Sequence, residues 1–201
     1  MPEHNLGVFL TRAQPPTNAH IDYVRHIATT SKVGLILVGS ANKVGTLRNP
    51  FSGPLRINMM HEAVNELFPE ANIMVCLLDD LTYENNLDPE NFKRWGQYLY
   101  AAVVGHTGEH EFAYFTGESL QQVENWFGRH VETSITPVLL RSSALFGDLS
   151  ATRVRQALAD DNRSFVVANC PHSVARRYDQ LRKLYLEVIA APKTDFSALL
   201  T

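Results

Sequence analysis

The chain has 201 residues, of which 45% are hydrophobic and 19% are charged, and its formal net charge is -3 at pH 7. This length and composition allow one sizeable hydrophobic core, so we expect a single domain that spans residues 1–201. A slightly acidic chain lacks the basic excess that nucleic-acid-binding and membrane-surface proteins carry, which argues against both kinds of partner.

Cysteine content and the N-terminus argue against two further classes of protein. Cys76 and Cys170 are far apart in the sequence, with no second cysteine near either, so we expect buried free thiols rather than a zinc site or disulfide framework. The polar N-terminal residues lead directly into a strand pattern, and no apolar run approaches the length of a membrane span. We therefore expect a cytoplasmic protein.

Strand and helix patterns alternate along the chain. The apolar run at 6–10 predicts a strand, the amphipathic run at 19–31 a helix, and the apolar run at 33–38 a central parallel strand with both faces covered. The alternation continues with predicted helices at 54–68, 91–104 and 118–127 and predicted strands at 72–78, 111–115 and 136–140. This pattern predicts an α/β fold with a doubly wound parallel sheet, in which ligands bind at the carboxyl ends of the strands.

The C-terminal part of the chain has only helical patterns. From about residue 151 the pattern is helical, and over 174–189 apolar residues recur at helical spacing. We expect residues 170–201 to form a C-terminal helical segment that packs on the sheet, with a loose tail from 191 onward.

A hydroxyl and an imidazole lie one turn apart at the start of the first predicted helix. Thr17 and His20 follow a proline-rich turn, and the unpaired N–H groups of a helix N-terminus attract phosphate. The stretch Thr11-Arg-Ala-Gln-Pro-Pro-Thr-Asn-Ala-His20 resembles the (H/T)xGH signature of the nucleotidylyltransferase superfamily, in its GRFQPFHxGH and NPxTNxH forms. Ala19 stands where that signature usually has glycine.

A second phosphate-binding pattern opens the C-terminal helical region, in the stretch Leu149-Ser-Ala-Thr-Arg-Val-Arg155. Ser150 is the predicted N-cap, and the Thr152 hydroxyl and the Arg155 guanidinium follow within the first turns. The stretch resembles the ISxTxxR motif with which nucleotidylyltransferases hold the β and γ phosphates. A serine-capped helix with an arginine is common by itself, but its pairing with the first motif favours phosphate binding.

A third segment narrows the resemblance within the superfamily. Val38-Gly-Ser-Ala-Asn-Lys-Val-Gly-Thr-Leu-Arg-Asn-Pro-Phe-Ser-Gly-Pro-Leu-Arg56 resembles the GSA…(K/R)(N/D)PFTxxER segment of archaeal-type nicotinamide mononucleotide adenylyltransferases, the kind also found fused to Nudix domains. Leu55 stands where that family often has glutamate. The resemblance covers roughly residues 6–160 and implies a Rossmann-like sheet. No Nudix signature is present in the sequence, so a second hydrolase activity is not expected.

The resemblance implies a reaction in which the phosphate of nicotinamide mononucleotide attacks the α-phosphorus of ATP, with Mg²⁺ bound through the ATP phosphates rather than by protein ligands. The catalytic residues that it implies are His20, Thr17, Arg12, Arg48 and Arg155. The ATP-binding residues that it implies are Gln14, Thr17, His20, Gly117, Ser150, Thr152 and Arg155. The acceptor-binding residues that it implies are Ser40, Asn49, Arg56, Asp80 and Trp95.

Other interpretations of the same sequence stay open. Adenylyl or cytidylyl transfer to another small phosphate acceptor, such as pantetheine phosphate or a sugar phosphate, needs the same phosphate motifs, and so does a non-catalytic nucleotide-binding sensor of the same fold. Trp95 fits a core position as well as a stacking one. The sequence leaves open whether Asp79 or Asp80 points inward, whether nicotinamide or nicotinate is preferred, and whether the chain forms a homo-oligomer.

Overall fold

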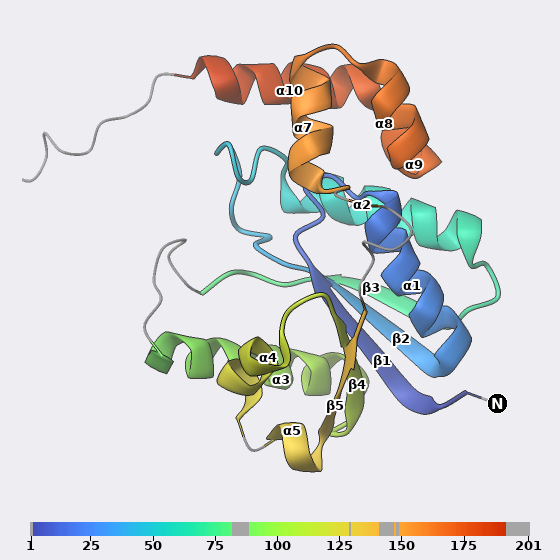
Figure 1. The fold of residues 1–201 in the computed structure, drawn as a ribbon, viewed down its shortest axis with the longest axis vertical. Coiled ribbons are helices and arrows are strands. Elements are labelled where there is room, and N and C mark those ends of the chain that lie inside the picture. Colours follow the sequence, from blue (N-terminus) through green and yellow to red (C-terminus); the bar gives the residue numbers. More distant parts are fainter. Residues whose placement is uncertain (1, 82–88, 129, 141–146, 148, 192–201) are drawn as a thin grey trace, which may run out of the picture.

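A computed structural model describes residues 2–81, 89–128, 130–140, 147 and 149–191 of the chain. Its centre is a parallel five-stranded sheet in the order β3-β2-β1-β4-β5 (Figure 1). The strands are β1 (His4–Thr11), β2 (Ser31–Val38), β3 (Ile73–Leu77), β4 (Phe112–Thr116) and β5 (Ile135–Leu139). This architecture confirms the predicted α/β fold. The order of the strands reverses between β1 and β4, and an open α/β sheet has a crevice for ligands at such a point.

Helices cover both faces of the sheet. On one face lie α1 (Asn18–Thr30) and α2 (Gly53–Leu67), and on the other lie α3 (Pro89–Thr107) and α4 (Leu120–Phe127). Side chains of β2 alternate between the two, since Ile36 packs in the α1 and α2 core and Leu35 in the α3 and α4 core. The run at 33–38 is apolar because both of its faces are covered. A short helix, α5 (His130–Thr133), precedes β5.

The first two strands are longer than the hydrophobic pattern predicts. β1 and β2 each begin two residues before the predicted start, and His4 pairs with Ser31 in the parallel ladder. Polar residues at strand ends contribute backbone hydrogen bonds to the ladder without adding to the apolar pattern, so hydrophobicity does not reveal them.

The C-terminal helices are shorter and more numerous than predicted. They are α7 (Ala151–Ala159), α8 (Arg163–Asn169), α9 (His172–Ala175) and α10 (Tyr178–Ala190), and in Figure 1 they lie together at one end of the molecule. The prediction of one continuous helix over 174–189 is wrong, because the helical structure is interrupted between the end of α9 at Ala175 and the start of α10 at Tyr178. Val174, Tyr178 and Leu181 nevertheless share one buried cluster with Met59 of α2. The apolar spacing therefore continues across the break, and periodicity alone does not show it.

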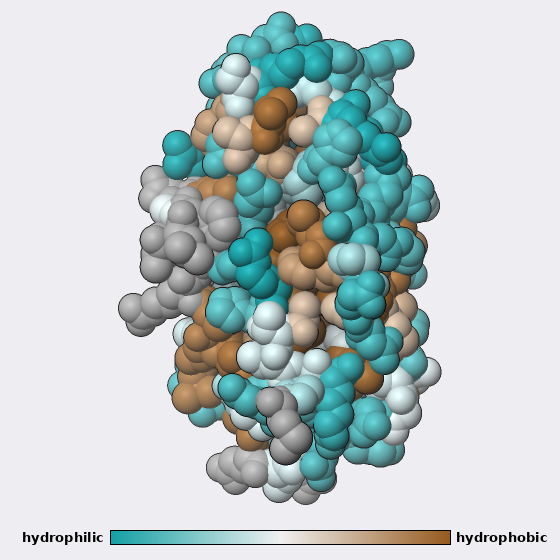
Figure 2. All heavy atoms as spheres, turned by 90° about the vertical axis from the view of Figure 1, so that its right-hand side faces the viewer, coloured by the Kyte–Doolittle hydropathy of each residue, from teal (hydrophilic) through white to brown (hydrophobic). Residues whose placement is uncertain are grey.

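An ion pair joins α2 to the segment between α9 and α10. The Arg177 guanidinium donates to both carboxylate oxygens of Glu62 at 2.6 Å, and Arg176 donates to the same carboxylate. These hydrogen bonds lower the pKa of Glu62 to about 2. Figure 2 shows the right-hand side of the view in Figure 1, where hydrophilic residues interrupt the hydrophobic ones. Within the described ranges, no helix combines the length and the apolar character needed to cross a membrane.

Gly96 sets how closely α3 and α4 approach. A Cβ atom at this position would lie 1.7 Å from the Trp126 carbonyl oxygen. We expect Gly96→Ala to lower the free energy of unfolding by about 1–3 kcal/mol, because the backbone of α4 must move away. Gly105→Ala on the same helix is the matched control, since nothing lies within 4 Å of its Cβ position. It should raise stability by about 0.5–1 kcal/mol. Urea denaturation of both variants checks this, and equal stabilities would contradict it.

Candidate active site

A cavity of about 710 Å³ lies at the carboxyl ends of β1, β2 and β4, where the strand order reverses. The N-terminal turns of α1 and α7 also face it, so two helix N-termini point at one space. The predicted site residues that line it are Arg12, Gln14, His20, Ser40, Arg48, Asp80, Trp95, Gly117, Ser150, Thr152 and Arg155. The structure thus brings together residues that are far apart in sequence.

Thr17 and His20 form one hydrogen-bonded unit at the start of α1. Thr17 is the N-cap, and its backbone N–H donates to His20 Nδ1 at 2.9 Å. Because Nδ1 accepts this hydrogen bond, the neutral ring carries its proton on Nε2. Thr17 is 1% exposed and does not line the cavity, whereas His20 does. The geometry therefore makes Thr17 the support of the imidazole, with Nε2–H as its remaining donor.

The imidazole of His20 is neutral at physiological pH. Burial desolvates the charged form and lowers the pKa of His20 from 6.5 to about 4. A neutral imidazole in a cavity next to helix N-termini can still donate one hydrogen bond, from Nε2–H, to an anion.

Arg155 connects α7 to the loop after β1. Its Nη1 donates to the Gln14 carbonyl at 2.8 Å and its Nη2 to Thr152 Oγ1 at 3.1 Å. Desolvation by burial lowers the pKa of Arg155, and its interaction with the Tyr185 side chain, whose oxygen accepts a hydrogen bond from the guanidinium, opposes that shift. Ser150 is the N-cap of α7, as predicted, and its hydroxyl accepts the Arg153 N–H.

The side chain of Gln14 is bonded within the protein. Its Nε2 donates to the Phe51 carbonyl at 3.1 Å, and its Oε1 accepts the Phe51 N–H at 3.0 Å. We expected Gln14 to bind ATP, but its amide instead joins the loop after β1 to the segment before α2. These two bonds use one N–H and one lone pair of the amide and fix its orientation at the cavity.

Two predicted acceptor residues do not line the cavity. Arg56 is fully buried in α2, and its guanidinium bonds to backbone carbonyls behind the cavity wall. Asn49 is 1% exposed, and its backbone N–H donates to Thr46 Oγ1 to close a turn. Both positions support the loop after β2 and lie behind the lining of the cavity, so their direct contact with an acceptor stays a prediction.

Asp80, rather than Asp79, points inward. The carboxylate of Asp80 accepts the Ser40 hydroxyl at 3.0 Å and pairs with Lys43 at 3.1 Å, whereas Asp79 is exposed. The Asn42 side chain bonds to both the N–H and the carbonyl of Asp80. Sequence reasoning missed the contacts of Lys43 and Asn42 with Asp80, because Asn42 is 38 positions away from Asp80 in the sequence and nothing in the pattern indicates that they are close.

An aromatic wall closes the side of the cavity opposite α7. Trp95 is half-buried, lines the cavity and also packs at a tilt against Tyr98, with ring centroids 5.8 Å apart. It is therefore both a core residue and a cavity residue. Trp126 and Phe92 line the same wall and were missed, although the predicted helices at 91–104 and 118–127 contain both. Their amphipathic pattern does not distinguish a cavity side chain from a core one.

Gly117, in the loop after β4, lies very close to the Tyr23 side chain of α1. A Cβ atom there would lie 2.5 Å from the hydroxyl of Tyr23, which donates to the Leu140 carbonyl. Only glycine lets the loop after β4 approach this tyrosine, so the backbone itself forms the cavity surface at this point.

The donor set does not form a metal site by itself. Among the described residues, no group of three or more His, Cys, Asp or Glu side chains could hold a metal ion. The carboxylates at the cavity wall are Asp80 and Glu118.

Comparisons with known proteins agree on one activity class. A protein of Thermococcus sibiricus named nicotinamide-nucleotide adenylyltransferase is 28% identical over 156 residues, which is 77% of this chain and 74% of that protein. The protein of the same name from Thermococcus onnurineus is 26% identical over 154 residues, 77% of this chain and 72% of its own length. No protein-family model matches the chain.

Solved structures share the fold. A bifunctional NMN adenylyltransferase/ADP ribose pyrophosphatase of Francisella tularensis, complexed with AMP and a manganese ion, matches with a TM-score of 0.65 and 18% identity over 93% of this chain. This chain spans about half of that enzyme, 52% of its length. A Plasmodium falciparum nicotinic acid mononucleotide adenylyltransferase matches with a TM-score of 0.56 and 11% identity, over 90% of this chain and 97% of its own.

The low pKa of His20 makes stability depend on pH. Since the unfolded chain binds a proton on this imidazole near pH 6.5 and the folded chain only near pH 4, the free energy of unfolding should fall by about 3 kcal/mol as the pH decreases across that window. We expect His20→Gln to lose less stability over the same range. Urea denaturation at several pH values checks this, and parallel curves for both proteins would contradict it.

Proposed function

We propose that this chain, which is a homologue of the archaeal nicotinamide-nucleotide adenylyltransferases, forms NAD and pyrophosphate from ATP and nicotinamide mononucleotide. The observation that carries the proposal is the cavity, in which a neutral imidazole, arginines and two helix N-termini meet at the point where the strand order reverses. This set suits a polyphosphate, because these hydrogen-bond donors and positive charges line one shared space.

The reaction is a single displacement at phosphorus. An oxygen of the mononucleotide phosphate forms a bond to the α-phosphorus of ATP, the bond from that phosphorus to the bridging oxygen breaks, and pyrophosphate leaves with the electron pair. No proton has to be removed from an ionised phosphate nucleophile. The task of the protein is to hold the two anions in line and to stabilise charge on the phosphoryl oxygens.

His20 and the arginines divide that task in our proposal. His20 donates Nε2–H to an α-phosphate oxygen while Thr17 holds the ring. Arg12 and Arg48 are exposed at the cavity and bind phosphates from two different loops. Arg155, together with the hydroxyls of Ser150 and Thr152 and the N-terminus of α7, faces the β and γ phosphates.

The acceptor lies toward β2, β3 and α3 in our proposal. Ser40 and Asp80 are bonded to each other beneath this end of the cavity, and Trp95 offers a ring face at the wall. Asn49 and Arg56 contribute indirectly by holding the loop. Mg²⁺, bound through the ATP phosphates, would neutralise part of their charge.

The proposed activity is tested with a panel of acceptors. Purified protein is incubated with ATP and Mg²⁺ and, separately, with nicotinamide mononucleotide, nicotinate mononucleotide, pantetheine phosphate and a sugar phosphate, and the products are identified by mass. We expect NAD and pyrophosphate with nicotinamide mononucleotide. A product with pantetheine phosphate or a sugar phosphate alone would contradict the acceptor. ATP binding without any product would instead indicate a non-catalytic sensor.

Arg155 should not be replaceable by lysine. Arg155→Lys loses the forked contact that reaches both the Gln14 carbonyl and Thr152, so we expect KM for ATP to rise and kcat to fall by about tenfold or more. Arg153→Lys, two residues away on the exposed face of α7, is the matched control and should keep wild-type kinetics. Steady-state assays with varied ATP decide this, and equal ATP kinetics for the two variants would place Arg155 outside the triphosphate site.

A further inference from the structure

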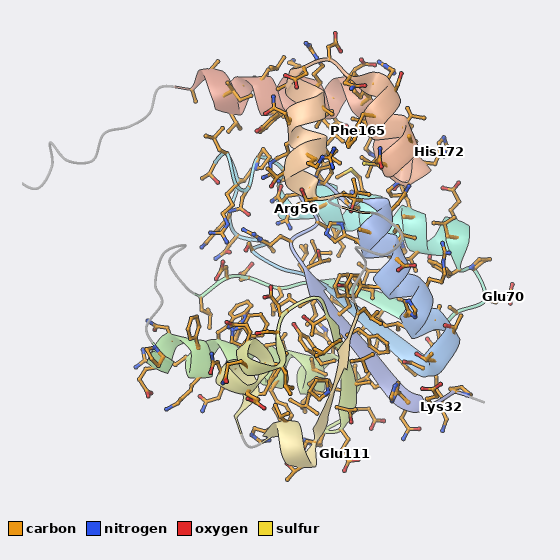
Figure 3. All side chains as sticks on the ribbon, viewed as in Figure 1. Lys32, Arg56, Glu70, Glu111, Phe165 and His172 are labelled. Carbon is orange, nitrogen blue, oxygen red and sulfur yellow. The ribbon has the colours of Figure 1, made fainter. Side chains whose placement is uncertain are left out.

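Arg56 lies at the junction of the sheet and the C-terminal helices. Figure 3 shows it in the middle of the molecule, whereas the labelled Lys32 and Glu70 lie at the periphery. Its side chain has no exposed surface. Its Nε donates to the Phe51 carbonyl at 3.0 Å, Nη1 to the carbonyls of Arg12 and Gly39 at 2.6 and 2.8 Å, and Nη2 to the Ser40 carbonyl at 2.9 Å.

These four carbonyls belong to separate segments that form the cavity. The Arg12 carbonyl follows β1, those of Gly39 and Ser40 follow β2, and that of Phe51 precedes α2. Arg12 and Ser40 themselves line the cavity. Gly39 lines it as well, so one guanidinium fixes the backbone of three cavity residues that come from neighbouring strand ends.

We propose that Arg56 is a positioning residue that holds the loops after β1 and β2 in the arrangement needed for adenylyl transfer. Its effect on turnover rests on the proposed function, while its effect on the loops does not. It touches no substrate and acts through the backbone of Arg12, Gly39 and Ser40.

The four carbonyl groups around residue 56 require an arginine at this position. A guanidinium has five N–H donors in a rigid plane, and here four of them are used by carbonyls that converge from different directions. An ammonium group has three donors around one atom and cannot reach all four. Burial, with a smaller contribution from the nearby charge of Arg12, lowers the pKa of Arg56 to about 10, so the group stays charged at neutral pH.

The backbone at Ser40 shows why the loop needs such support. Ser40 has φ +50°, in the left-handed region that a non-glycine residue adopts at a cost of about 1 kcal/mol. Arg56 binds its carbonyl and Asp80 binds its hydroxyl, so both ends of the residue are held. Without the guanidinium, Ser40 would relax out of this conformation, and the segment that runs from Gly39 to Arg48 would move with it.

The experiment compares Arg56→Lys with a core truncation on the same helix. Val64→Ala is the matched control, because Val64 is 3% exposed, packs in the α1 and α2 core and makes none of the loop contacts. Both variants are assayed well below their melting temperatures, so that both are folded. The readouts are amide hydrogen exchange of the free protein and steady-state kinetics with ATP and nicotinamide mononucleotide.

We expect Arg56→Lys to raise amide exchange at least about tenfold in residues 12–17 and 39–51, and Val64→Ala to leave those segments as in the wild type. We also expect Arg56→Lys to lower kcat at least about tenfold while each KM changes less than about threefold, because misplacement acts on the transition state. Val64→Ala should keep wild-type kcat.

Wild-type exchange in the loops of Arg56→Lys would overturn the proposal, and so would faster exchange with a kcat equal to that of Val64→Ala. If the wild-type protein forms no NAD, the proposed function fails. The exchange data then decide by themselves whether Arg56 holds the loops.

Discussion

The site depends on backbone carbonyl groups that point into the protein at the ends of β1 and β2. An unpaired buried carbonyl costs about 1–3 kcal/mol, so these groups need donors that the sheet itself does not provide. Arg56 bonds to those of Arg12, Gly39 and Ser40, and Arg155 bonds to that of Gln14. Two buried guanidinium groups thus hold the loops, Arg56 from behind the cavity wall and Arg155 at the cavity itself.

This arrangement also sets the electrostatics of the cavity. Arg56 and Arg155 bring positive charge close to the cavity surface, and the backbone carbonyls and the Thr152 hydroxyl that accept their hydrogen bonds are neutral groups. Arg12 and Arg48 add charge at its surface, while the imidazole of His20 stays neutral because burial desolvates it. Such a cavity favours polyphosphate over a neutral ligand, and the bound anions would balance charges that are close to one another.

Most of the fold could be predicted from the sequence, because apolar strands alternate with amphipathic helices. Each predicted strand exists, and so does each helix predicted before residue 150. The two helix N-terminal motifs also predicted which residues meet at the cavity, since parallel strands end at one edge. Periodicity could not predict that Arg56 is buried, because a long cation is usually a surface residue. Periodicity also could not show that the Gln14 side chain bonds to the Phe51 backbone, or that the helical structure is interrupted between α9 and α10. Both features depend on contacts between distant segments.

The central claim is that the α-phosphorus of ATP is the atom attacked. The most direct measurement follows the phosphorus of ATP labelled in either the α or the γ position during turnover with nicotinamide mononucleotide. The account predicts that the α label enters the dinucleotide in proportion to the acceptor consumed, and that the γ label appears in pyrophosphate. Transfer of the γ label to the acceptor, or release of the α label as AMP with the acceptor unchanged, would contradict it.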